Sequence, residues 1–100
     1  MDILEKAIKY YGPQNQMMQS MEELSELSVA ISKCIRYPDK IETKQHITEE
    51  IADVLIMIDQ LKIILDIKDY EIRCYRDYKL QRLNSRIERG EWNEKKTYKQ

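Results

Sequence analysis

The stretch from Gln14 to Arg36 has the sequence QNQMMQSMEELSELSVAISKCIR, in which apolar residues recur with the period of an α-helix. Intervals of three and four residues place these apolar side chains on one face: Met17, Met21, Leu24, Leu27, Ile31 and Ile35. The turn Tyr37-Pro38-Asp39 ends the pattern, because the residue before a proline disfavours helical backbone. The spacing therefore predicts a long amphipathic helix over residues 14–36.

Three further helices are predicted from apolar spacing and from the residues that end helices. The first covers residues 2–11 and stops at Gly12-Pro13. Another covers residues 48–65, with an alternative start near Thr43, and the last runs from Asp66 or Asp69 to Gly90. The sequence thus predicts four helices separated by short polar connections.

Length and composition favour an all-α, four-helix bundle-like subunit. One hundred residues form a single domain, and with only two Gly and two Pro the chain has little material for strand turns or Gly-rich phosphate loops. We expect one all-α domain over residues 1–90 and a charged C-terminal tail over residues 91–100. The helix at 48–65 is apolar on several sides, which predicts a homodimer or homotetramer.

The chain shows no pattern of a membrane or secreted protein. Its longest apolar stretch is interrupted by Asp53, Asp59 and Lys62, and its first residues lack a basic start followed by an apolar block. We therefore expect a cytoplasmic protein without a membrane partner. Cys34 and Cys74 lie far apart within helical patterns, which fits neither a zinc site nor a disulfide scaffold, so we expect buried thiols.

Charge is divided along the chain. Residues 1–66 hold twelve acidic and seven basic residues, whereas residues 67–100 hold six acidic and ten basic ones. An acidic first part argues against a nucleic-acid-binding surface, and no nucleic-acid-binding motif is present. The division leaves room for cations on one side of a site and phosphates on the other.

Two pairs of carboxylates share a spacing of three residues, Glu23 with Glu26 and Glu50 with Asp53. On a helix each pair lies on one face, but pairs such as Asp2 and Glu5 have the same spacing. Apolar residues flank Asp53 on both sides, so we expect its carboxylate to be buried, where it must be protonated, paired with a basic residue or bound to a metal ion. If the two helices pack antiparallel, four carboxylates converge, and oxygen ligands suit Mg²⁺ or Mn²⁺.

The segments Glu22-Glu23-Leu24-Ser25-Glu26-Leu27 and Glu50-Ile51-Ala52-Asp53-Val54-Leu55 resemble the two-part signature of the MazG-type all-α nucleoside triphosphate pyrophosphohydrolases, ExxE followed by ExxD. Residues 11–16, YGPQNQ, precede the first motif and are similar to a segment of many small members, in which an aromatic residue and a glycine are followed by glutamine. The resemblance implies an oligomeric helical bundle and Mg²⁺-dependent cleavage of an NTP or dNTP to its monophosphate and pyrophosphate. It assigns the catalytic and metal-ligating roles to Glu23, Glu26, Glu50 and Asp53.

Basic residues of the last helix could meet the phosphates of such a substrate. Lys79, Arg82, Arg86 and Arg89 fall within one arc of that helix, which is either a solvated face or a phosphate contact, with Lys79 and Arg86 as the candidates. Gln16 lies on the same stripe as Glu23 and either contacts substrate or is exposed. These three residues complete the predicted site.

Two other functions remain open at this point. Phosphoribosyl-ATP pyrophosphohydrolase has related acidic helices, but Leu55-Ile56-Met57 stands where we expect a Tyr-His pair. A non-enzymatic oligomeric adaptor could use the acidic pairs to bind basic partners. His46 is the only histidine, which excludes a di-iron bundle with two Glu-x-x-His pairs, and we expect it in a loop or first turn instead of in a catalytic role.

Overall fold

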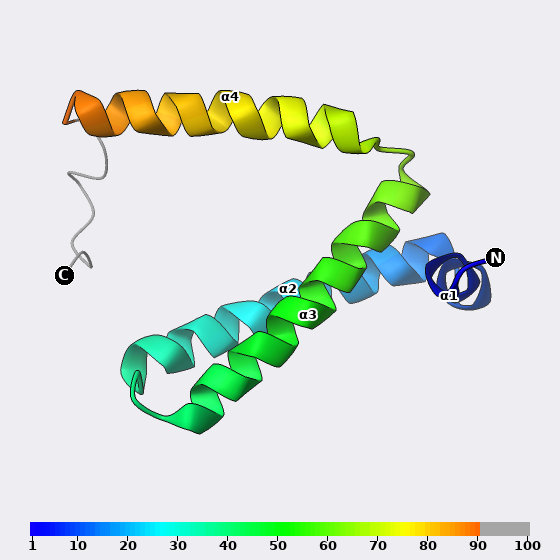
Figure 1. Ribbon diagram of the computed structural model, residues 1–100. Helices are drawn as coiled ribbons and strands as arrows, with labels where there is room; N and C mark the ends of the chain where they lie inside the picture. Colours follow the sequence, from blue (N-terminus) through cyan, green and yellow to red (C-terminus); the bar gives the residue numbers. More distant parts are fainter. Residues whose placement is uncertain (91–100) are drawn as a thin grey trace. The chain divides into compact units, whose positions relative to one another are not determined.

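The computed structural model describes residues 1–90, and these residues form four α-helices and no strand (Figure 1). The helices are α1 (Ile3–Tyr11), α2 (Pro13–Arg36), α3 (Ile41–Ile64) and α4 (Asp69–Glu88). The predicted all-α class is therefore confirmed for the described part of the chain. The tail predicted over residues 91–100 lies outside it.

The chain divides into two compact units, Met1–Ile67 and Lys68–Gln100. In the first unit α2 and α3 pack along each other, and α1 contacts both of them. In the described part of the second unit, α4 is the single helix, and its side chains are exposed apart from the half-buried Ser85. All four predicted carboxylate ligands belong to the first unit.

Local sequence explains how α1 begins and how it turns into α2. Asp2 caps α1 by accepting a hydrogen bond from the backbone N–H of Glu5, whose side chain accepts one from the backbone N–H of Asp2. Gly12 has a φ of 95°, a conformation that suits glycine, and its N–H donates to the carbonyl of Ile8. Pro13 then occupies the first turn of α2, where a missing N–H has no cost.

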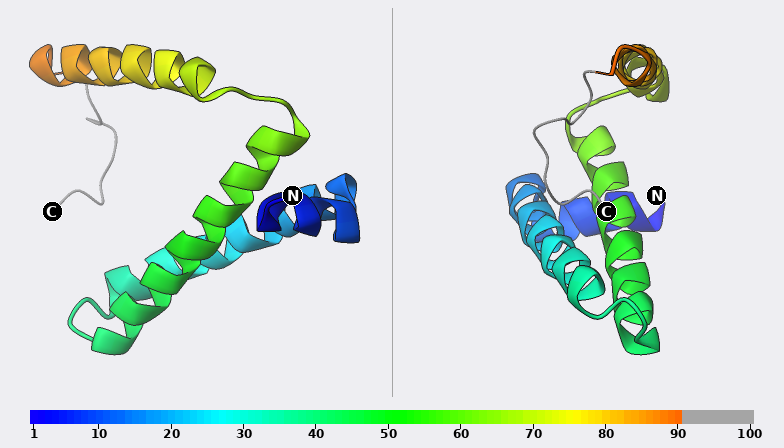
Figure 2. Two further views of the ribbon diagram at one scale, coloured as in Figure 1. Left: turned by 45° about the vertical axis from the view of Figure 1, so that its right-hand side comes forward. Right: turned by 90° about the vertical axis from the view of Figure 1, so that its left-hand side faces the viewer.

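A short loop joins α2 to α3 and makes them an antiparallel hairpin (Figures 1 and 2). Because α3 begins at Ile41, the predicted start at residue 48 is wrong, whereas the alternative start near Thr43 is close to the observed one. Thr43 Oγ1 lies 2.7 Å from the carbonyl oxygen of Lys40 and 3.0 Å from that of Tyr37, so its single hydroxyl hydrogen can be donated to either one or shared between them. These contacts tie the first turn of α3 to the loop that precedes it.

The interface between α2 and α3 is small and partly polar. Among the described residues only Ala30 and Val54 are buried apolar side chains. Beside them, Gln16 Nε2 donates to Gln60 Oε1 at 2.7 Å, and both side chains are buried. Ser20 Oγ lies 2.9 Å from the carbonyl of Gln16. Polar pairs thus fill positions that a larger core would give to leucine or isoleucine.

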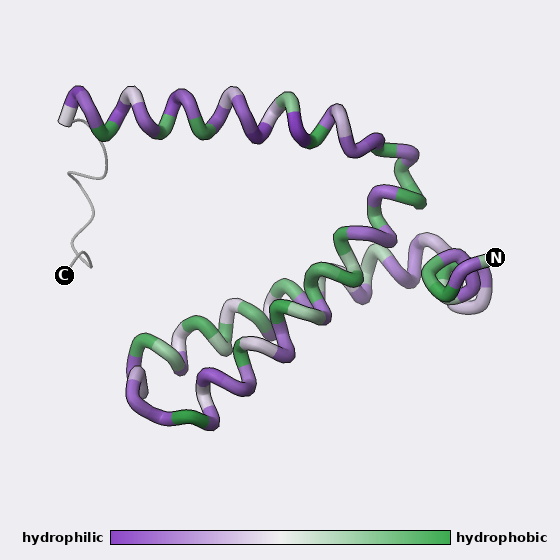
Figure 3. Tube along the Cα trace, in the orientation of Figure 1, coloured by the Kyte–Doolittle hydropathy of each residue, from purple (hydrophilic) through white to green (hydrophobic). Residues whose placement is uncertain are grey.

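Many large apolar side chains of the first unit remain exposed. Figure 3 shows apolar positions recurring along α2 and α3, and the exposed ones on these two helices include Met17, Met18, Met21, Leu24, Ile31, Ile51, Leu55, Ile56 and Ile58.

The expectation that the cysteines are buried is wrong, because Cys34 is half-buried and Cys74 is exposed. No helix among residues 1–90 is both long enough and apolar enough to cross a bilayer.

Candidate metal centre

Three glutamates from two helices converge in the first unit. One carboxylate oxygen each of Glu23, Glu26 and Glu50 lies within 4.8 Å of the others. Glu26 lies about ten residues before the end of α2, and Glu50 lies about ten residues after the start of α3. Each separation corresponds to about 15 Å of helix. The antiparallel hairpin therefore brings them to the same level, with Glu23 one turn earlier along α2.

Two oxygens of this cluster are buried without a hydrogen-bond partner, Glu23 Oε1 and Glu50 Oε2. Glu50 as a whole is only 8% exposed. The other oxygen of Glu23 accepts a hydrogen bond from Gln19 Nε2 at 2.9 Å, which orients the carboxylate from one side. Because burying an unpaired carboxylate oxygen is costly, these two oxygens are positions at which a cation could bind.

The electrostatics of the cluster agree with its geometry. The negative charges of Glu23 and then Glu50 raise the pKa of the exposed Glu26 above its ordinary value, and Asp53 adds to this effect. Within residues 1–90 no basic side chain forms an ion pair with any of these four carboxylates. Buried carboxylates are ordinarily paired with a basic side chain, and the buried Glu50 has no such partner among the described residues.

Asp53 occupies a different place from the one predicted. We expected its carboxylate to be buried among apolar residues, but Asp53 is exposed. The apolar neighbours on which that expectation rested, among them Ile56, are exposed themselves. Asp53 is near enough to act on the pKa of Glu26, yet the three glutamates form the close group without it.

A pocket of about 220 Å³ opens beside the cluster. It is lined by Ser25, Glu26 and Val29 from α2 and by His46 and Glu50 from α3. Ser25 and His46 were not among the predicted site residues. Because α3 begins at Ile41, His46 lies one helical turn before Glu50 on the same face, so this spacing identifies it once the start of α3 is known.

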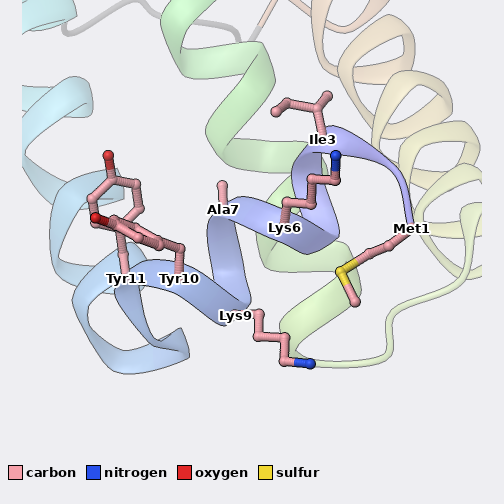
Figure 4. Close-up of a pocket in the computed structure, with 7 residues that line it drawn as sticks. All are labelled: Met1, Ile3, Lys6, Ala7, Lys9, Tyr10 and Tyr11. Atoms are coloured by element: carbon pink, nitrogen blue, oxygen red, sulfur yellow. The ribbon is translucent and has the colours of Figure 1, made fainter.

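A larger pocket, of about 580 Å³, follows α1 and has a different character (Figure 4). Its lining residues are apolar, aromatic or basic: Met1, Ile3, Lys6, Ala7, Lys9, Tyr10 and Tyr11. The rings of Tyr10 and Tyr11 meet edge to face, with their centroids 4.9 Å apart. No carboxylate lines this pocket, so it shares no residue with the cluster.

The chain was compared with protein-family models, with curated proteins and with solved structures. None of these comparisons finds a match. Function is therefore inferred from the residues of the cluster and from the sequence resemblance alone.

The remaining predicted site residues lie in two different settings. Gln16 is not exposed, because it is buried against Gln60 in the interface of α2 and α3. Lys79 and Arg86 are exposed on α4, in the second unit. Contact of any of the three with a substrate stays a prediction.

The cluster fits a hard divalent cation. Its donors are carboxylate oxygens from both sides of a helix hairpin, which suits Mg²⁺ or Mn²⁺, whereas no cysteine or histidine is part of the close group. A cation placed among the three glutamates would give the unpartnered oxygens of Glu23 and Glu50 a partner. The same cation would offset the repulsion between the carboxylates.

Proposed function

We propose that this chain is the subunit of an oligomeric, Mg²⁺-dependent nucleoside triphosphate pyrophosphohydrolase of the MazG type. Its reaction would convert an NTP or dNTP to the monophosphate and pyrophosphate, with Mn²⁺ able to replace Mg²⁺. Support comes first from the convergence of Glu23, Glu26 and Glu50 with two buried carboxylate oxygens that lack a partner. The paired ExxE and ExxD motifs supply the reaction class.

In this proposal Glu23, Glu26 and Glu50 hold the cation, and Asp53 stands beside them. When bound, Mg²⁺ neutralises the triphosphate and lowers the pKa of the attacking water. Water attacks the α-phosphorus, the bond to the β-phosphate oxygen breaks, and pyrophosphate leaves. Solvent reaches the exposed carboxylates of Glu26 and Asp53, so a carboxylate not used as a ligand can accept the proton that water loses.

Pyrophosphate release from a panel of NTPs and dNTPs, measured with Mg²⁺ and with EDTA, tests the proposal. Hydrolysis should require the metal, and Glu23→Gln or Asp53→Asn should abolish it without loss of helical content. Glu22→Gln is the matched control, since this exposed neighbour lies outside the close group. Failure of every nucleotide to react, together with failure to bind Mg²⁺, would leave the adaptor hypothesis in its place.

We further propose that the subunit forms a homodimer or homotetramer. Ile51, Leu55, Ile56 and Ile58 are all exposed, and helical counting places them on more than one side of α3. Soluble monomers seldom expose apolar patches beyond a few hundred Å². Another copy of the chain could cover these side chains and enlarge the small core. Sedimentation at micromolar concentration should show a species of at least twice the chain mass, and a stable monomer would contradict this part of the proposal.

A further inference from the structure

The pocket beside the cluster contains two hydrogen-bond donors that the proposed metal site does not use. Its lining consists of Ser25, Glu26, Val29, His46 and Glu50. The two glutamates carry negative charge and Val29 is apolar. Only the hydroxyl of Ser25 and the imidazole of His46 can therefore donate a hydrogen bond to an anion in this pocket.

Both donors are unused within the described chain. Neither the side chain of Ser25 nor that of His46 forms a hydrogen bond or an ion pair with another residue of 1–90. They come from opposite helices, Ser25 from α2 and the half-buried His46 from α3. The two donors thus stand on both sides of the pocket into which Glu26 and Glu50 also face.

We propose that His46 and Ser25 bind phosphate oxygens of the metal-bound nucleotide, an inference that rests on the proposed function. Whole small-molecule ligands occupy pockets of about 300–1,000 Å³, so a pocket of about 220 Å³ receives a part of the substrate. The phosphate chain is that part, because it must reach the cation held by the glutamates. His46 is assigned to the substrate because it lies outside the close group of ligand atoms.

Calorimetric titration separates this role from metal binding. The full chain is titrated first with Mn²⁺ alone and then, at saturating Mn²⁺, with a panel of α,β-imido nucleoside triphosphates, which resist cleavage at the proposed bond. His46→Ala should weaken nucleotide binding by about 10- to 100-fold, the range for a hydrogen bond to a charged group. Its Mn²⁺ affinity should stay within about twofold of wild type, whereas Glu50→Gln should lose both.

Two further variants sharpen the comparison. His46→Gln keeps an N–H donor at this position and should recover part of the lost nucleotide affinity. Ser25→Ala should weaken nucleotide binding, and Ser28→Ala, at an exposed serine of the same helix outside the pocket, should not.

Each other result overturns the assignment in a recognisable way. Wild-type nucleotide affinity in His46→Ala and Ser25→Ala would reject the two donors and leave the pyrophosphohydrolase proposal intact. Parallel loss of Mn²⁺ and nucleotide in His46→Ala would make His46 a metal ligand instead. A wild-type chain that binds Mn²⁺ but no nucleotide, or binds neither, would reject both proposals together.

Discussion

Glu50→Gln should stabilise the metal-free protein, although it alters the most buried residue of the cluster. In the wild type, oxygens of Glu50 and Glu23 lie no more than 4.8 Å apart. At an effective dielectric constant of about 20, two unit charges at that distance repel by about 3.5 kcal/mol. The substitution removes this repulsion at nearly constant volume and brings an amide that can donate to the neighbouring carboxylates.

Counter-ions and solvent reduce the gain, so we expect the free energy of unfolding in EDTA to rise by about 1–3 kcal/mol. For a chain of this size, 1 kcal/mol corresponds to a Tm increase of about 4–8 °C. Added Mg²⁺ should reverse the order. The wild type gains about 4.1 kcal/mol at a cation concentration one thousand times Kd, and the variant gains little because it has lost a ligand.

Thermal melts of both proteins at one protein concentration, in EDTA and in Mg²⁺, measure this crossover. Glu49→Gln is the control, since it makes the same change of charge one residue away on the exposed side of α3. If Glu50→Gln melts below the wild type in EDTA, or if it differs from Glu49→Gln in neither condition, the like-charge explanation is refuted.

Two other perturbations follow from the structure, and a third follows from the sequence. The raised pKa of Glu26 makes the folded state bind more protons than the unfolded state. The stability of the metal-free protein should therefore fall as the pH rises from the ordinary glutamate pKa of about 4 through the pKa of the folded state. Glu26→Gln should flatten this slope in thermal melts recorded from about pH 4 to 7. Gln16→Ala should lower the free energy of unfolding by about 1–3 kcal/mol in urea titrations, because it leaves a buried amide without its partner. If Lys79 and Arg86 contact the substrate phosphates, Lys79→Ala and Arg86→Ala should lower kcat/KM by a factor equivalent to about 1–3 kcal/mol, with little effect on Tm. If they form a solvated face, both changes should stay within about 0.5 kcal/mol of the wild type.

Matched controls exist for these three tests. Glu42→Gln, at an exposed glutamate of α3 that is not among the charges raising the pKa of Glu26, should keep the pH slope of the wild type. Gln14→Ala, at an exposed glutamine of α2, should change stability by less than about 0.5 kcal/mol. Arg73→Ala, on the opposite side of α4 by helical counting, should leave kcat/KM unchanged, and equal losses at Arg73 and Arg86 would indicate general attraction in place of a positioned contact.

The sequence by itself determined that the chain forms helices and that Glu23 and Glu26 share one face of a helix. Apolar spacing located α2 almost to the residue, and Gly12-Pro13 marked the break before it, because backbone conformation at such positions depends on local sterics. The three-residue spacing of Glu23 and Glu26 put both on one face of α2 before any tertiary structure was known. These are short-range properties, so sequence patterns report them well.

Only the tertiary structure decided which residues meet and how deeply they are buried. Glu50 is buried while Asp53, three residues later, is exposed, and helical counting places both on one stripe. Burial depends on how α2 crosses α3, which the contacts of the whole hairpin determine. Long-range packing of this kind leaves no periodic signal in the sequence, because its partners are distant along the chain.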